Sequence, residues 1–174
     1  MRYLVLTFAL IMICGGFSYG QKIIFEGDNI FGHKELALVW DEIKNDSNNV
    51  VMMKDSLYMR AEKKGYFDAE INISYKNDSL ITINVNSGPV YIIGSIEFNI
   101  IGSPLTEAEI ELESRFVSKA ASSDNFQALL ASAVDLYADN GYAFAQSRIN
   151  SMRMSDASVK IELQITSGPY VQID

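Results

Sequence analysis

A five-residue motif that occurs twice constrains the fold of this chain more than any other feature of its sequence. Gly65-Tyr66-Phe67-Asp68-Ala69 recurs as Gly141-Tyr142-Ala143-Phe144-Ala145, seventy-six residues later. Two further pairs of segments keep the same order: Ile23-Ile24-Phe25 with Ile96-Glu97-Phe98, and Ser87-Gly88-Pro89 with Ser167-Gly168-Pro169. Because all three anchors repeat at spacings of seventy-three to eighty residues, they predict two tandem copies of one structural unit.

Each copy shows the same order of expected elements: one strand, two helices and a two-stranded hairpin. The strands alternate apolar and polar residues, and the helices carry apolar residues at helical spacing. In the first copy these elements are expected at 22–27, 36–43, 50–61, 69–75 and 81–85. In the second copy the strands are expected at 94–100, 146–154 and 159–165. The first helix is expected to begin at Thr106, which forms a capping box with Glu109, and the second to run from Asp124 to Gly141.

The repeated glycine and tyrosine are interpreted as structural residues. Gly65 and Gly141 directly follow the second helix of each copy, and glycine readily adopts the left-handed conformation that closes a last helical turn. Tyr66 and Tyr142 are expected to fold back into the core as the chain turns into a strand. The Gly-Pro pairs that end each copy are assigned to the same structural motif: Gly88 with Pro89, and Gly168 with Pro169.

Residues 1–20 are predicted to form a cleavable secretory signal. Arg2 precedes an uncharged run over 4–14, and Ser18 and Gly20 supply small residues before a cleavage site at Gln21. The run is shorter than the roughly 20 residues that span a bilayer, so an uncleaved anchor is disfavoured. A lipoprotein signal would be cleaved before Cys14, but Met12 and Ile13 are too large for the positions ahead of it.

The charge of the chain is strongly acidic, and this limits its partners. Without the signal, 13 basic and 22 acidic residues remain, and the half over 93–174 is the more acidic of the two. A surface of this sign repels phosphate backbones, so nucleic acid is not expected as a partner. Cys14 is the only cysteine, so the mature chain would be stabilised without disulfides.

The order of elements, the Gly-Tyr-x-x-Ala motif at the helix-to-strand junction and the terminal Gly-Pro resemble POTRA (polypeptide-transport-associated) domains of outer-membrane assembly proteins such as BamA and TamA. The resemblance covers essentially all of 21–174. It implies an α+β fold in which each unit is a three-stranded mixed sheet with two helices on one face. The expected organisation is a signal over 1–20, one unit over 21–92, a second over 93–170 and the start of a third over 171–174.

The resemblance also implies a function and a location. It implies a periplasmic module that receives unfolded outer-membrane polypeptides or accessory assembly proteins, with attachment to the outer membrane through a C-terminal barrel that this chain lacks. The chain is therefore interpreted as a fragment. Members of the family leave the second strand of each unit at an open sheet edge, where a partner strand can add. The expected binding residues are Asp68, Ala69, Glu70, Ile71, Asn72, Ile73, Ser74 and Tyr75 in the first unit and Phe144, Ala145, Gln146, Ser147, Arg148, Ile149, Asn150 and Ser151 in the second.

No residue pattern predicts catalysis, a metal or a cofactor. His33 is the only histidine and has no second histidine or cysteine in the mature chain with which to form a zinc site. Glu107, Glu109, Glu111 and Glu113 alternate along a helix, so they are expected to spread around it. No nucleophile elbow, phosphate loop or dinucleotide fingerprint is present. Trp40 is expected to be a packing residue, and the chain is predicted not to be an enzyme.

Two other binding functions remain open at this point. One is a periplasmic scaffold for folded partner proteins, as in cell division or two-partner secretion. The other is a surface carbohydrate-binding module, for which Tyr58, Tyr75, Tyr91 and Tyr137 would have to form an exposed aromatic platform.

Overall fold

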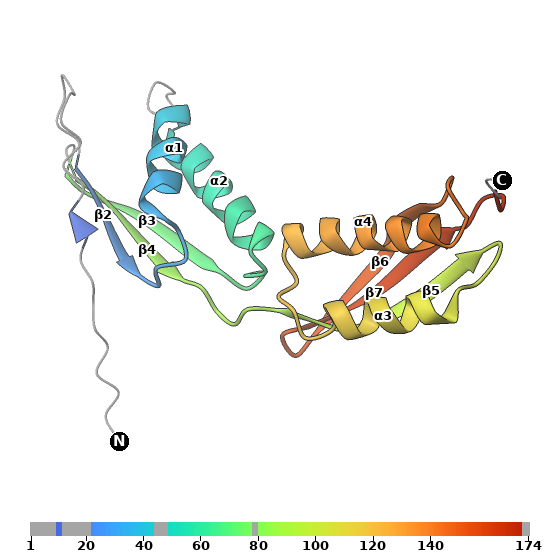
Figure 1. The fold of residues 1–174 in the computed structure, drawn as a ribbon. Helices are drawn as coiled ribbons and strands as arrows, with labels where there is room; N and C mark the ends of the chain where they lie inside the picture. The colour runs from blue at the N-terminus through green and yellow to red at the C-terminus, as the bar shows by residue number, and fades with distance from the viewer. Residues whose placement is uncertain (1–9, 12–21, 44–48, 78–79, 172–174) are drawn as a thin grey trace. The chain divides into compact units, whose positions relative to one another are not determined.

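The computed structural model describes residues 10–11, 22–43, 49–77 and 80–171 (Figure 1). The chain divides into two compact units: the first ends at Gly88, and the second begins at Pro89 and also includes Lys63–Gly65. The predicted fold class is confirmed: apart from a short additional strand at the start of the first unit, each unit has the order β-α-α-β-β and a mixed sheet. The predicted signal lies outside the described residues except for two of them, and residues 172–174 of the expected third unit also lie outside.

The first unit is built on a sheet in which strand β4 is central. Its elements are β1 (Leu10–Ile11), β2 (Lys22–Gly27), α1 (His33–Ile43), α2 (Asn49–Lys63), β3 (Glu70–Asn77) and β4 (Leu80–Asn86). The strand order is β1-β2-β4-β3, with β4 parallel to β2 and antiparallel to β3. One strand was not predicted: β1 comes from the expected signal and pairs antiparallel with β2. The expected turn at 78–79 lies outside the described residues.

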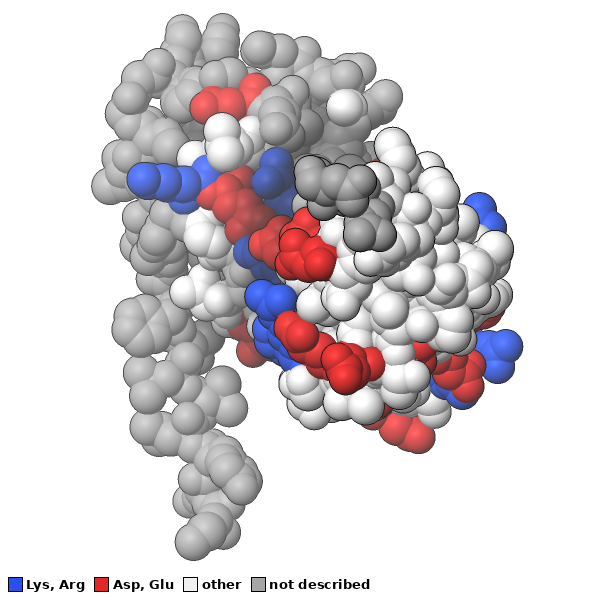
Figure 2. Space-filling model, turned by 45° about the vertical axis from the view of Figure 1, so that its right-hand side comes forward, with Lys and Arg blue, Asp and Glu red and all other residues white. Residues whose placement is uncertain are grey.

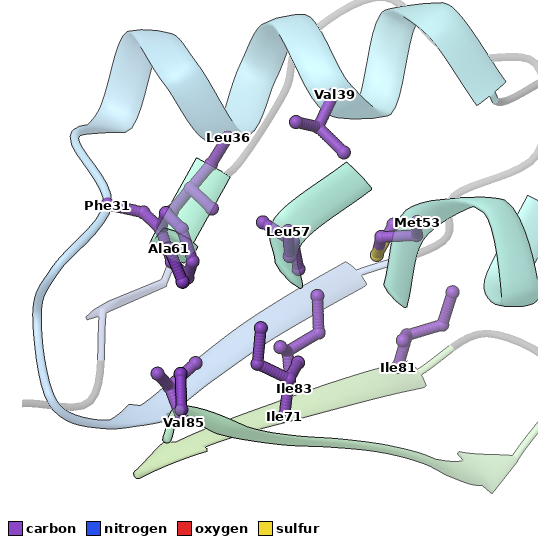
Figure 3. Close-up of a cluster of buried hydrophobic side chains, with 11 residues drawn as sticks. Phe31, Leu36, Val39, Met53, Leu57, Ala61, Ile71, Ile81, Ile83 and Val85 are labelled. Carbon is purple, nitrogen blue, oxygen red and sulfur yellow. The ribbon is translucent and has the colours of Figure 1, made fainter. Parts of the chain in front are cut away.

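Helices α1 and α2 cover one face of this sheet, and the core lies between the two layers (Figure 3). Val39 from α1 and Leu57 from α2 point toward the sheet above Ile83, and Leu36 lies beside Phe31 and Ala61. Leu57 and Ile83 are fully buried. The apolar spacing in the sequence thus identified the buried faces of both helices and of the central strand.

The second unit repeats this arrangement with a three-stranded sheet. Its elements are β5 (Ile92–Ile101), α3 (Thr106–Phe116), α4 (Ser123–Asp139), β6 (Gln146–Ser155) and β7 (Ser158–Thr166). The strand order is β5-β7-β6, with β7 parallel to β5 and antiparallel to β6. Leu112, Leu129 and Tyr137 from the helices and Ile161 and Leu163 from β7 are fully buried. A two-residue turn joins β6 and β7, and both of its residues have positive φ, as tight hairpins require.

Two helix caps differ from the prediction. Thr106 is the first residue of α3 rather than its cap; Leu105 occupies the cap position and makes no side-chain cap bond. The Leu105 N–H instead donates to the Tyr137 hydroxyl at 3.3 Å, which is a contact with a distant part of the unit. Asp124 lies in the first turn of α4, and Ser122 is the cap, with its hydroxyl accepting from the Asn125 N–H at 3.3 Å.

Candidate protein-binding edges of the two sheets

Strands β3 and β6 each lie at one edge of a sheet, so one row of their backbone N–H and C=O groups faces away from the neighbouring strand. Of the expected binding residues, Glu70–Tyr75 lie in β3, while Asp68 and Ala69 precede it. Gln146–Ser151 lie in β6, while Phe144 and Ala145 precede it. Strand β6 continues to Ser155, so the expected list stopped four residues before the end of this edge.

Each edge strand begins next to a helix that ends in the same way in both units. The N–H of Tyr66 donates to the carbonyl of Ala61, and the N–H of Tyr142 donates to the carbonyl of Tyr137, both at 3.0 Å. These bonds span five residues and close the last helical turn around a glycine with positive φ, 92° at Gly65 and 89° at Gly141. Tyr66 and Tyr142 are half-buried, so each ring lies at the margin of the core.

The serine of each Ser-Gly-Pro segment forms hydrogen bonds with the loop that follows β2 in the first unit and β5 in the second. In the first unit the Asp28 carboxylate accepts hydrogen bonds from the Ser87 N–H at 2.8 Å and the Ser87 hydroxyl at 2.9 Å. These bonds favour the ionised carboxylate and lower the pKa of Asp28. In the second unit the Ser103 N–H donates to the Ser167 hydroxyl at 3.0 Å. The first unit therefore uses a charged acceptor where the second uses a neutral one.

The glycines of these segments lie against the residues that lead into the edge strands. A Cβ on Gly88 would be 3.2 Å from the Asp68 Cβ, and one on Gly168 would be 3.2 Å from the Phe144 carbonyl oxygen. Both glycines also have positive φ, 63° and 70°. A side chain at either position would be strained, and it would displace the start of the edge strand.

The edge of β3 is partly closed by a side chain from α2. The Ile71 N–H donates to the Tyr58 hydroxyl at 3.2 Å, so this N–H points away from β4 and already has a partner. The side chain of Ile71 is fully buried, and Ile73 packs against the same core. On the opposite face of the strand Glu70, Asn72 and Ser74 are exposed. A strand that adds here would have to displace the Tyr58 hydroxyl.

The edge of β6 is open along its described length. Among the described residues, no side chain makes a hydrogen bond to its backbone; the Ser147 hydroxyl turns to the Leu130 carbonyl of α4, at 2.8 Å. Ile149 is still partly buried, but the helix-side face is exposed closer to the hairpin. Met152 and Met154 are 46% and 53% exposed, although their partners on β7, Ile161 and Val159, are buried. The helix-side face of β6 thus offers exposed apolar surface directly beside its free backbone groups.

A bulge interrupts β6 in the middle. The register with β7 shifts between Ile149 and Ser151, which leaves Asn150 as the extra residue. The Asn150 side-chain amide donates to the Gln164 oxygen at 3.0 Å and to a Glu162 oxygen at 3.4 Å, so it lies over the solvent face of the sheet. A bulge bends an edge strand and limits uncontrolled pairing with other edges.

The solvent face of the second sheet is polar, and its two carboxylates have partners. Glu97 forms an ion pair with Lys160. Glu162 accepts from the Ser151 hydroxyl at 2.9 Å, and this bond, together with that from Asn150, lowers the pKa of Glu162. Both carboxylates are therefore engaged within the sheet itself.

Other residues considered from the sequence do not form a site in the described part of the chain. No group of three or more histidine, cysteine, aspartate and glutamate side chains there could hold a metal ion. Tyr137 is fully buried and Tyr91 is 9% exposed, so the four tyrosines form no exposed platform. His33 and Trp40 lie in α1, and their side chains, like that of Tyr75, are outside the described part. No helix within the described ranges is long and apolar enough to cross a membrane.

Comparisons with known proteins find similarity among solved structures only. No family model and no curated protein matches the chain. It is similar to POTRA1-2 of the periplasmic domain of Omp85 from Anabaena, with 11% identity, a TM-score of 0.47 and coverage of 88% of this chain and 97% of that one. It is also similar to BamA POTRA3-5 from Haemophilus influenzae, with 16% identity, a TM-score of 0.46 and coverage of 85% and 65%. CdiB from Escherichia coli matches with 11% identity, a TM-score of 0.44 and coverage of 82% and 26%.

This chain thus spans less than two thirds of the BamA fragment and about a quarter of CdiB. The Omp85 and BamA structures are POTRA domains, the kind of domain that the sequence resembles. We base the fold assignment on the strand order and helix placement within each unit, as described above.

Proposed function

We propose that this chain is a periplasmic POTRA region of an outer-membrane protein assembly or translocation factor, and that it binds unfolded outer-membrane polypeptides or partner subunits at its sheet edges. The open edge of β6 carries the proposal. Its backbone groups face outward over ten residues, and the exposed Met152 and Met154 lie beside them. The predicted signal at 1–20 supports an exported location.

Strand addition suits a module that receives many different polypeptides. The affinity comes mainly from main-chain hydrogen bonds, which every polypeptide can supply, and side-chain contacts add selectivity. The chain is on this view a binding module without catalytic groups. The two sheets provide two such edges, and the Tyr58 hydroxyl makes the β3 edge the less accessible of the two.

Hydrogen exchange on the full chain tests the proposal directly. Addition of a peptide copied from a strand of an outer-membrane barrel is expected to slow amide exchange along β6, because a partner strand would protect its outward N–H groups. Helix α3 supplies the internal control and is expected not to change. Unchanged exchange in both β6 and β3 at saturating peptide would contradict strand addition. Binding of a folded partner without protection of either strand would favour the scaffold role instead.

Proline substitutions give a second, independent test. Ile73→Pro and Ile149→Pro each remove one backbone N–H from an edge strand. By alternation along the strand, the N–H of Ile73 points the same way as that of Ile71, toward the open edge. Each variant is expected to remain folded by circular dichroism and to bind the peptide more weakly. Undiminished binding by both folded variants would contradict the proposal.

A further inference from the structure

The charges of the second unit are segregated between its helices and its sheet. Helices α3 and α4 together carry seven acidic side chains and one basic one: Glu107, Glu109, Glu111, Glu113, Asp124, Asp135 and Asp139 against Arg115. The three strands carry three basic and two acidic side chains: Arg148, Arg153 and Lys160 against Glu97 and Glu162. Figure 2 shows one face of the molecule, on which acidic side chains gather in several places between broad uncharged areas. In an acidic chain, the sheet of this unit is therefore a local concentration of positive charge.

The two arginines of β6 are the cations of this sheet that lack a carboxylate partner. Lys160 is paired with Glu97. Arg148 donates to the neutral amide oxygen of Gln164 at 3.0 Å. The positive charge of Arg153 contributes to the lowered pKa of Glu162, but the two side chains form no ion pair. Among the described residues, neither arginine forms an ion pair, and both are exposed on the edge strand.

The register places both arginines on the same face of the sheet. Arg148 pairs with Gln164 and Arg153 with Lys160, which are four residues apart on β7 and alternate with the buried core residues. The bulge at Asn150 compensates for the five-residue spacing on β6. An unbulged strand added on the other side of β6 would accordingly meet the two guanidinium groups with side chains four residues apart.

We propose that the β6 edge selects extended segments that carry carboxylates four residues apart on one face and apolar side chains on the other. This inference rests on the proposed function, since it assumes strand addition at β6. The carboxylates pair with Arg148 and Arg153 on the solvent face. The apolar side chains contact Met152 and Met154 on the helix-side face, where both methionines are exposed.

The β3 edge serves as a natural control for this selectivity. Strand β3 carries one acid, Glu70, and one base, Lys76, where β6 carries two bases. A segment with two carboxylates would therefore gain no net charge attraction at β3. Selectivity for acidic segments is expected in the second unit alone.

Four matched peptides of about nine residues test the proposal on the full chain. All four alternate valine with polar residues. The first three have two variable polar positions four residues apart, which carry glutamate in the first peptide, glutamine in the second and lysine in the third. The fourth peptide carries its two glutamates only two residues apart. At low salt the first peptide is expected to bind β6 about three- to tenfold more tightly than the glutamine peptide, because exposed ion pairs contribute modestly. The lysine peptide is expected to bind least, and the fourth peptide between the first and the glutamine peptide. Raising the salt to about 1 M should remove these differences through screening.

The variant R148Q/R153Q separates this inference from the proposed function. It is expected to bind the glutamate and glutamine peptides equally, while protection of β6 in hydrogen exchange persists. The control variant K160Q removes a cation that is already paired and is expected to keep the preference. If the unsubstituted chain binds both peptides equally at β6, the charge inference is wrong and the proposed function stands. If none of the peptides protects β6, the inference fails; if none protects β3 either, the proposed function fails with it.

Discussion

The two units have the same strand order and the same helix ends, yet their edges offer different chemistry to a partner. In the first unit the Tyr58 hydroxyl occupies the outward N–H of Ile71. In the second, β6 has ten residues with a central bulge, two arginines without ion pairs and two exposed methionines. The comparison shows that two copies of one fold need not expose the same sheet edge, because residues beside the edge decide how accessible it is.

The largest expected effect is on stability, and it compares how strongly the folding of each unit depends on the core residues of its central strand. Leu163→Ala in β7 and Ile83→Ala in β4 each remove methyl groups from a fully buried position. Each is expected to lower the free energy of unfolding of its own unit by about 2–5 kcal/mol, through lost burial and the cavity left behind. Chemical denaturation followed by hydrogen exchange within each unit measures the effect. A loss below about 1 kcal/mol would show that the affected core can collapse around the smaller side chain.

An intermediate effect is expected when the edge of β3 is opened. Tyr58→Phe removes the hydroxyl that accepts from Ile71 and should cost about 0.5–1.5 kcal/mol of stability. The same change exposes an outward N–H, so binding of a strand-forming peptide at β3 is expected to increase. Tyr66→Phe is the matched control, since no hydrogen bond of the Tyr66 hydroxyl is described. Equal peptide protection of β3 in both variants would show that Tyr58 does not restrict this edge.

The smallest expected effect concerns the pH dependence of the hydrogen bonds that Ser87 and Ser167 form with the loops after β2 and β5. Because Ser87 lowers the pKa of Asp28, the ionised carboxylate stabilises the folded first unit at pH values above the ordinary pKa of 3.8. That contribution is lost as the pH falls through the lowered pKa of the folded state. Asp28→Asn should remove this pH-dependent part at a cost of about 1 kcal/mol or less, because the site is largely exposed and screened by solvent. Stability measured at several acidic pH values checks the result.

The corresponding hydrogen bond in the second unit provides the comparison. Its acceptor is the Ser167 hydroxyl, which does not titrate, so Ser167→Ala is expected to lower stability to the same extent at every pH. A pH-dependent loss in Ser167→Ala, or an unchanged pH profile in Asp28→Asn, would contradict the assigned roles.

The fold could be predicted from the sequence because its signals are local and occur twice. The glycines at 65 and 141 end helices through backbone conformation, and alternation along β7 marks its buried side; both are properties of adjacent residues. Of the two caps that were predicted wrongly, that of Ser122 is local and that of Leu105 involves a distant contact. Leu105 replaces Thr106 at the start of α3 because its N–H reaches Tyr137, and no spacing in the sequence reveals that hydroxyl.

The candidate edges were less accessible to sequence analysis for the same reason. The bulge at Asn150 is one extra residue in a pairing register, which appears only when β6 is aligned with β7. In a strand without the bulge, the five-residue spacing would place Arg148 and Arg153 on opposite faces. The Tyr58–Ile71 bond likewise joins a helix to a strand across the tertiary structure.

Strand β1 links the predicted signal to the edge of the first sheet. Leu10 pairs with Phe25 and Ile11 with Ile24, so residues of the expected signal shield the free side of β2. If the predicted cleavage before Gln21 takes place, β1 is lost, and β2 replaces it as the edge strand opposite β3. The backbone groups of Ile24 and Phe25 that β1 occupies would then be free to pair with another strand.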